Sequence, residues 1–249
     1  MVIDHSGEFF PNSPDWFRFI GRAATPLFFF ASAWGFYYTH DRKSYLLRLY
    51  IMSVIMTIGN ACIYNLCSSK QKIFNNVFPT LFIGCLVIYI FEKYRDRKTR
   101  FRYLILIGIW QFGTAFLTMS ICSYSFITNF LPLKMDTQSF GAIFGNVFFT
   151  EGGFLFVLFF IGTYILKDSP CVLSLFLYLF SLGCMYISRV ANPAPGMTLF
   201  NFDTYQWMMV FAMPVYALYN RKPGPKIKWF FYLFYPLHIW MLYICASFI

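Results

Sequence analysis

The sequence predicts an all-α protein, a polytopic transmembrane helical bundle with about eight full spans and an N-terminal remnant of another. Three observations predict this class. The composition is 59% hydrophobic and only 12% charged, which lies outside the range of soluble globular domains. Apolar windows of about 19 residues recur along the chain, as in helices that cross a bilayer. The basic residues are concentrated in alternate loops, as the positive-inside bias requires.

The predicted spans follow one another along most of the chain. Most connections between them are short and polar, and longer ones are predicted near residues 122–140 and 190–203. We expect a single integral-membrane domain over residues 1–249, with the lipid bilayer as its first partner. The spans are predicted at about 19–38, 46–66, 77–92, 103–121, 141–166, 171–189, 204–219 and 229–248.

Lys and Arg are divided unevenly between alternate loops, fourteen against five, with Arg22 inside a span. The richer set is assigned to the cytoplasm, so residues 1–18 and Ile249 are predicted to lie outside. This placement accounts for the net charge of +10 without a nucleic-acid partner. The cytoplasmic set is Arg42, Lys43, Arg48, Lys93, Arg95, Arg97, Lys98, Arg100, Arg102, Lys167, Arg221, Lys222, Lys226 and Lys228; the outer set is Arg18, Lys70, Lys72, Lys134 and Arg189.

The first span carries Arg22 in a run that is otherwise apolar. A charged side chain near the bilayer centre costs roughly 2.5–3.5 kcal/mol on insertion scales. Arg22 therefore needs a partner or a function, unless it snorkels to the interface. Pro26 follows four residues later, where a proline can kink a helix.

The chain begins with an apolar triplet, and Asp4 and His5 follow it. This start is typical of the last turn of a helix, and we expect the beginning of an N-terminal span to be missing. From the residues alone, Asp4 and His5 are either members of a site at the level of Arg22 or part of a solvated terminus.

Two more ionisable side chains are predicted near the midplane. His238 lies about ten residues into the last span, and Glu151 about ten residues into the span that starts near Gly141. The two glycines after Glu151 indicate a helix break that lines a cavity; a structural ion pair with Arg22 is the alternative. For His238 the alternative is a hydrogen-bonded packing residue.

A cluster of this kind fits proton transfer or acyl transfer. An imidazole, with an unperturbed pKa of about 6.5, suits the removal of a proton from an amine or hydroxyl nucleophile. A carboxylate such as Asp4 can fix the tautomer of the imidazole. A guanidinium can hold a carboxylate, a phosphate or a developing oxyanion.

Four stretches give these residues a family resemblance. They read M-V-I-D-H at 1–5; I-G-R-x-x-x-P-L-F-x-F at 20–30 with K-x-Y-L-L-R-L at 43–49; N-x-x-F-P-T-L-x-I-G at 75–84; and F-D-x-Y-Q-W at 202–207 with F-F-Y-x-F-Y-P-L-H at 230–238. In these stretches the chain resembles the TraX family, named after the conjugative F-pilin acetylation protein.

The resemblance implies a multi-pass membrane acetyltransferase in a bacterial plasma membrane. Its acyl donor would be cytosolic acetyl-coenzyme A, and its acceptor an amine or hydroxyl of a peptide or glycan at the membrane or outside it. His5 takes the catalytic role, with Asp4 as its partner, Arg22 as polar anchor and His238 as second imidazole. Family members usually have a full helix before the D-H pair. The residues expected to bind substrate are Glu151, Asn60, Gln206 and Trp207.

A proton-coupled transporter or carrier is the alternative function, with Glu151, Arg22 and the histidines as its pathway. The absence of a visible sequence repeat speaks weakly against it. The basic loops Lys93–Arg102 and Arg221–Lys228 either set the topology alone or attract the phosphates of the coenzyme. The sequence assigns no other residues to cofactor binding, predicts no metal site, and defines neither the acceptor nor the oligomeric state.

Overall fold

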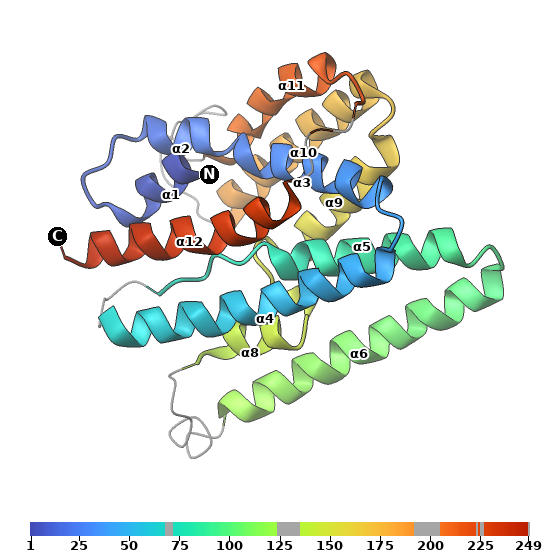
Figure 1. Cartoon of the computed structure of the whole chain (residues 1–249), viewed down its shortest axis with the longest axis horizontal. Helices are drawn as coiled ribbons and strands as arrows, with labels where there is room; N and C mark the ends of the chain where they lie inside the picture. Colours follow the sequence, from blue (N-terminus) through green and yellow to red (C-terminus); the bar gives the residue numbers. More distant parts are fainter. Residues whose placement is uncertain (68–71, 124–134, 192–204, 223, 225–226, 249) are drawn as a thin grey trace. The chain divides into compact units, whose positions relative to one another are not determined.

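The computed structural model describes residues 1–67, 72–123, 135–191, 205–222, 224 and 227–248, and every regular element in these residues is a helix (Figure 1). The predicted all-α class is therefore confirmed. The chain divides into two compact units. Unit 1 comprises residues 1–38 and 162–228, and unit 2 comprises residues 39–161 and 229–249.

Helices occupy the predicted spans, although three of the spans are interrupted. Breaks divide the ranges 19–38, 141–166 and 204–219 into shorter pieces. Within the described residues, four helices are long and apolar enough to cross a bilayer, which agrees with a polytopic membrane protein. They are α4 (Arg42–Cys67), α6 (Arg97–Ser123), α10 (Pro170–Ala191) and α12 (Lys228–Ser247).

Unit 1 contains the N-terminal helices and α10. Helix α1 contacts α2, and the 3-10 helix η2 contacts α2, α3, α10 and α11. The predicted span 19–38 is interrupted at Arg22–Ala23, one turn before Pro26, where a proline disturbs the carbonyl of the residue four positions earlier. Pro26 lies in the first turn of α3, where its missing N–H has no intrahelical acceptor. The bounds are α1 Val2–Phe9, α2 Trp16–Gly21, α3 Ala24–Tyr37, η2 Tyr205–Ala212 and α11 Met213–Leu218.

Unit 2 contains α4, α5 (Phe78–Lys93), α6, α8 (Thr137–Ile143), η1 (Val147–Phe149) and most of α12. Helix α9 (Gly153–Leu166) is shared, because the division between the units falls after Ile161. In unit 2, α4 contacts α5 and α8, and α6 contacts the same two helices. Carboxylate side chains cap the N-termini of two of these helices. Asp96 accepts the Thr99 N–H at the start of α6, and Asp136 accepts the Ser139 N–H at the start of α8.

The helix break predicted beside Glu151 is present. Gly152 and Gly153 have φ angles of +75° and +59°, a region that glycine enters without the steric penalty of a Cβ. Glu151 therefore lies in the turn before α9, at the break that the two glycines predict. On the other side of the break, Gln111 of α6 accepts the Val147 N–H and donates to the Gly145 carbonyl. The side chain replaces helical hydrogen bonds that the broken backbone lacks.

Candidate functional site

Helices α1 and α2 of unit 1 cross closely because glycines lie at their contact. A Cβ on Gly21 would lie 2.3 Å from Cβ and 2.6 Å from Cα of Asp4, and one on Gly7 would lie 3.0 Å from Arg18 Cδ. Small residues of this kind let two helix backbones approach. The close crossing brings the D-H pair of the first stretch against the I-G-R of the second.

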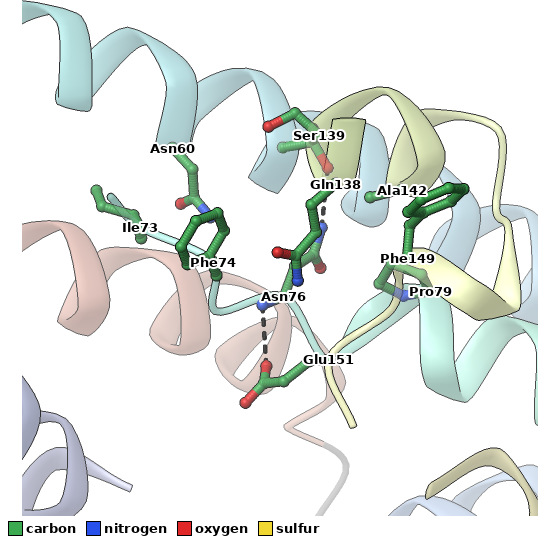
Figure 2. Close-up of a pocket in the computed structure, with 11 residues that line it drawn as sticks. Asn60, Ile73, Phe74, Asn76, Pro79, Gln138, Ser139, Ala142, Phe149 and Glu151 are labelled. Carbon is green, nitrogen blue, oxygen red and sulfur yellow. Dashed lines mark hydrogen bonds between the residues drawn. The ribbon is translucent and has the colours of Figure 1, made fainter. Parts of the chain in front are cut away.

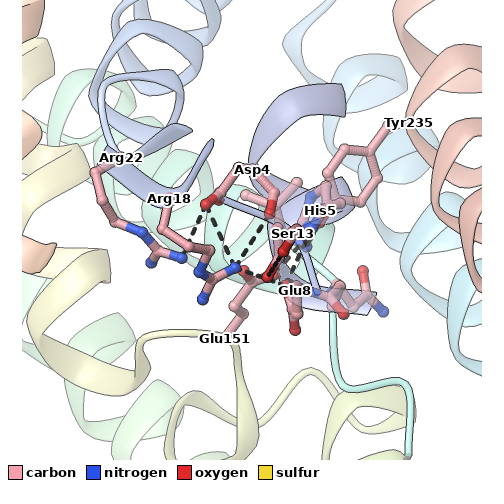
Figure 3. A network of polar contacts seen from close by, with 12 residues as sticks. Asp4, His5, Glu8, Ser13, Arg18, Arg22, Glu151 and Tyr235 are labelled. Atoms are coloured by element: carbon pink, nitrogen blue, oxygen red, sulfur yellow. Dashed lines mark hydrogen bonds and ion pairs between the residues drawn. The ribbon is translucent and has the colours of Figure 1, made fainter. Parts of the chain in front are cut away.

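Asp4 lies between two guanidinium groups, as Figure 3 shows. Arg22 Nη2 donates to Asp4 Oδ1 at 3.0 Å, and Arg18 Nη1 is 3.4 Å from the same oxygen. Asp4 is only 7% exposed, so its charge is largely removed from solvent and the paired guanidinium groups compensate it. Arg22 thus has the partner that a cation in an apolar run requires.

His5 is also buried, at 5% exposure, and Glu8 holds it. His5 Nδ1 lies 3.2 Å from Glu8 Oε2, and Arg18 Nη1 lies 3.3 Å from that oxygen. A carboxylate beside Nδ1 favours the tautomer that carries its proton there and leaves Nε2 as the basic nitrogen. The structure thus places Glu8 beside His5 Nδ1, the position expected of Asp4, while Asp4 contacts Arg22 and Arg18.

A cleft of about 330 Å³ opens beside this cluster. Glu8 and Arg18 line it, so the ion pair that supports His5 forms part of its wall. Tyr205 of η2 also lines the cleft. The remaining lining residues are Gly7, Phe10, Pro11, Ser13, Pro14 and Asp15. The volume is at the lower end of the range of ligand pockets.

The cluster in unit 1 combines an imidazole, whose Nδ1 lies beside a carboxylate, with a guanidinium at the wall of a cleft. The first can take a proton from a nucleophile, and the second can stabilise negative charge that develops on a carbonyl oxygen. In the parts of the chain that the structure describes, no group of three or more His, Cys, Asp or Glu side chains could hold a metal ion.

The sequence-based prediction missed Glu8 and Arg18. Glu8 lies three residues after His5, a spacing that places two side chains on one face of a helix, and this signal could have identified it. Arg18 was counted only as an outer loop cation. Its place opposite Asp4 and Glu8 depends on the α1–α2 crossing, which no local pattern shows.

Gln206 and Trp207, which were expected to bind substrate, lie on η2 in unit 1. Both are half-buried. Trp207 packs at 6.3 Å between ring centroids against Phe211. Among the described residues of η2, the side chain that lines the cleft is their neighbour Tyr205.

Unit 2 holds a different polar network, around Glu151. Glu151 Oε2 accepts the Asn76 N–H at 2.9 Å and lies 3.3 Å from the Tyr235 hydroxyl, while the Glu151 carbonyl accepts from the Thr80 hydroxyl at 3.0 Å. Tyr235 also accepts the Val77 N–H. The carboxylate therefore lies at the N-terminal end of α5, where the helix dipole favours negative charge.

Asn60 is buried in the same unit and joins three segments. Its Nδ2 donates to the Asn75 carbonyl at 3.0 Å, and its Oδ1 accepts from Trp240 Nε1 of α12 at 2.8 Å. Asn60 and Glu151 both line a small cavity, shown in Figure 2, together with Thr57, Asn76, Gln138 and other residues. The cavity measures about 20 Å³, which is room for about one water.

His238, the expected second imidazole, lies in α12 of unit 2. Its Nδ1 is 2.8 Å from the Phe234 carbonyl, one turn earlier. Its ring stacks on Phe234 at 4.9 Å between centroids and meets Tyr235 edge-on at 5.6 Å. These contacts place His238 beside the Tyr235 that reaches Glu151.

The stretches at 1–5 and 20–30 thus meet in unit 1, and those at 75–84 and 230–238 meet in unit 2. Residues 1–133, more than half of the chain, match the family described as TraX protein. The chain belongs to the TraX family. This family is associated with pilin acetylation. The match contains the Asp4, His5 and Arg22 stretches as well as the N-x-x-F-P-T-L-x-I-G stretch of α5, whereas the stretches around Gln206 and His238 lie beyond it.

A relative in Rickettsia prowazekii, described as an uncharacterized protein, is 28% identical over 160 residues. The alignment covers 59% of this chain and 58% of the relative, so the chain spans less than two thirds of that protein's length. No solved structure matches the chain.

Proposed function

We propose that this TraX-family protein is a membrane-embedded acetyltransferase. It moves an acetyl group from cytosolic acetyl-coenzyme A to an amine or hydroxyl of a peptide or glycan at the membrane or outside it. The observation that carries the proposal is the buried His5, held by Glu8 beside a cleft that Arg18 also lines. Family membership supports the reaction class, since the family is associated with pilin acetylation.

In this mechanism His5 Nε2 takes the proton of the acceptor as its amine or hydroxyl attacks the acetyl carbonyl. Glu8 holds the Nδ1 proton and stabilises the imidazolium that forms. Arg18, at the cleft wall, stabilises the oxyanion. The bond from the acetyl carbon to the thioester sulfur then breaks, and the proton held by His5 passes to the leaving thiolate.

The Asp4–Arg22 pair has a supporting role. It fixes α1 against α2, and this crossing holds His5 and Glu8 opposite Arg18. Glu151 and Asn60 of unit 2, with Gln206 and Trp207 of unit 1, are proposed to contact the polar parts of the substrate. His238 is proposed to support charge through its contacts with Tyr235.

The test uses purified protein in detergent with radiolabelled acetyl-coenzyme A and two acceptors, a short peptide with a free amino terminus and glucosamine. We expect saturable donor binding and label transfer to an acceptor, with transfer lowered about 10²–10⁴-fold in His5→Ala. His40→Ala is the matched control, because His40 is exposed and outside the site. Full transfer by His5→Ala would refute the catalytic assignment.

The carrier alternative makes a different prediction in the same preparation. Reconstituted vesicles would show proton-dependent flux of a solute, and the detergent-solubilised protein would show no saturable binding of acetyl-coenzyme A. That pair of results would replace the enzyme by a carrier that uses Glu151, Arg22 and the histidines.

A further inference from the structure

The turn between α5 and α6 in unit 2 presents a dense group of exposed cations. Within ten residues it carries five solvent-exposed Lys and Arg side chains, and Arg100 adds a half-buried sixth. We call the five the α5–α6 cationic surface: Lys93, Arg95, Arg97, Lys98 and Arg102.

The two carboxylates near this surface, Asp96 and Glu92, are engaged by groups outside it. Asp96 accepts from the Thr99 N–H and hydroxyl, both at 2.8 Å, and so caps α6. Glu92 forms an ion pair with Arg42. The cations outnumber these carboxylates, so the turn keeps a net positive charge that attracts anions.

Aromatic side chains accompany the cations. The rings of Tyr94 and Tyr103 stack at 4.5 Å between centroids, and their hydroxyls are 2.9 Å apart. Lys93 Nζ lies 5.0 Å from the Tyr94 ring and 5.4 Å from the Tyr89 ring. Tyrosine rings with this mixture of apolar and polar contacts are typical of the level of lipid headgroups.

Directly beyond the turn, α6 is covered by apolar side chains that protein does not bury. Phe101 is 64% exposed, Leu106 57% and Ile109 64%. In a membrane protein such a surface faces lipid tails. The cations therefore lie where the lipid-facing surface of α6 reaches the headgroups, one or two turns away along the same helix.

We propose that the α5–α6 cationic surface binds the phosphate groups of anionic phospholipids in the cytoplasmic leaflet. Lys93 and Lys98 act as point charges, and the exposed arginines can form paired hydrogen bonds to a phosphate. Anionic headgroups attract each cation near the surface, and salt weakens that attraction. The proposal does not depend on acetyl transfer.

The test is native mass spectrometry of the full chain released from nanodiscs of equal parts phosphatidylglycerol and phosphatidylcholine. We expect the wild-type protein to retain phosphatidylglycerol in preference to phosphatidylcholine. The variant R95Q/R97Q/K98Q should lower that preference at least about five-fold, because the loss of even one cation near a charged surface is expected to have an effect of this size. The charge-conserving variant R95K/R97K/K98R is the control and should keep most of the preference.

Two outcomes would overturn the proposal. One is an equal preference for phosphatidylglycerol in the wild-type protein and in R95Q/R97Q/K98Q. The other is a variant that keeps its lipid preference but binds free coenzyme A about ten-fold more weakly, which would make the surface a site for soluble phosphates. Because the substituted side chains are exposed, thermal melting of the variants is expected to match that of the wild-type protein.

Discussion

The two units both bury polar side chains, but they do so with different chemistry. In unit 1, two carboxylates, two guanidinium groups and an imidazole adjoin a cleft of about 330 Å³. In unit 2, amides and hydroxyls surround one carboxylate at a cavity of about 20 Å³. The first network lies beside a cleft and carries most of the charge, which supports placing the proposed reaction there, whereas the second forms hydrogen bonds to backbone groups where helices are broken.

The largest loss of stability is expected when the Asp4–Arg22 ion pair of unit 1 is broken. Asp4→Ala leaves the half-buried Arg22 without its carboxylate, which should lower the free energy of unfolding by about 3 kcal/mol. The double variant Asp4→Ala/Arg22→Leu should recover a large part of this loss, because it removes the uncompensated charge. The measurement is unfolding in mixed detergent micelles, and an additive double variant would show that the pair is not coupled.

The next largest loss of stability is expected where α1 crosses α2 in unit 1. Gly21→Ala places a Cβ 2.6 Å from the Asp4 backbone, so α1 must move. The free energy of unfolding should therefore fall by about 1–3 kcal/mol. Gly183→Ala in α10 is the matched control, since nothing lies within 4 Å of its new Cβ. Equal melting temperatures for the two variants would contradict the close α1–α2 contact.

A smaller effect is expected in unit 2. Tyr235→Phe removes the acceptor of the Val77 N–H and a contact to Glu151, which should cost about 1–2 kcal/mol. Tyr178→Phe serves as control because that residue is 44% exposed on α10. Hydrogen exchange at Val77 should rise in Tyr235→Phe alone; unchanged exchange would refute the role of Tyr235 at the start of α5.

The smallest effect on stability is expected at the N-terminal ends of α4 and α6 in unit 2. Hydrogen bonds from Ser44 lower the pKa of Asp41, and hydrogen bonds from Thr99 lower the pKa of Asp96. A lowered pKa stabilises the folded state above the unfolded value of about 3.9, and this contribution is lost as the pH falls through the folded pKa.

Hydrogen exchange in the first turns of α4 and α6 measures these caps. Protection should decrease as the pH falls below about 4 in the wild-type protein, after correction for intrinsic exchange. In Asp41→Asn and Asp96→Asn it should change little over the same range. A pH response that persists in Asp96→Asn would assign the effect to another group.

The helical fold could be predicted because its signals are local. Apolar length gave the span positions, and Gly152–Gly153 marked the break before α9. The split at Arg22–Ala23 falls one turn before Pro26, a residue that can kink a helix. The sequence marks this place as one where a break can occur, but the close packing of Gly21 against Asp4 depends on a tertiary contact that no local pattern shows.

The site was predictable in part for the same reason. Asp4, His5 and Arg22 were recognised because a family motif or an apolar surrounding made them conspicuous, and the structure brings Asp4 and Arg22 together. Glu8, Arg18 and Tyr205 have unremarkable polar surroundings in the sequence. Only the folding of α1 against α2 and η2 places them at the cleft.

The most direct test of the central claim compares the two units in one kinetic experiment. Acetyl transfer from labelled acetyl-coenzyme A is measured for His5→Ala in unit 1 and Glu151→Gln in unit 2, at varied acceptor concentration. We predict that His5→Ala lowers kcat about 10²–10⁴-fold and that Glu151→Gln raises KM while kcat stays within about ten-fold. Retained kcat in a folded His5→Ala protein, with kcat lost in Glu151→Gln, would contradict the assignment of the chemistry to unit 1.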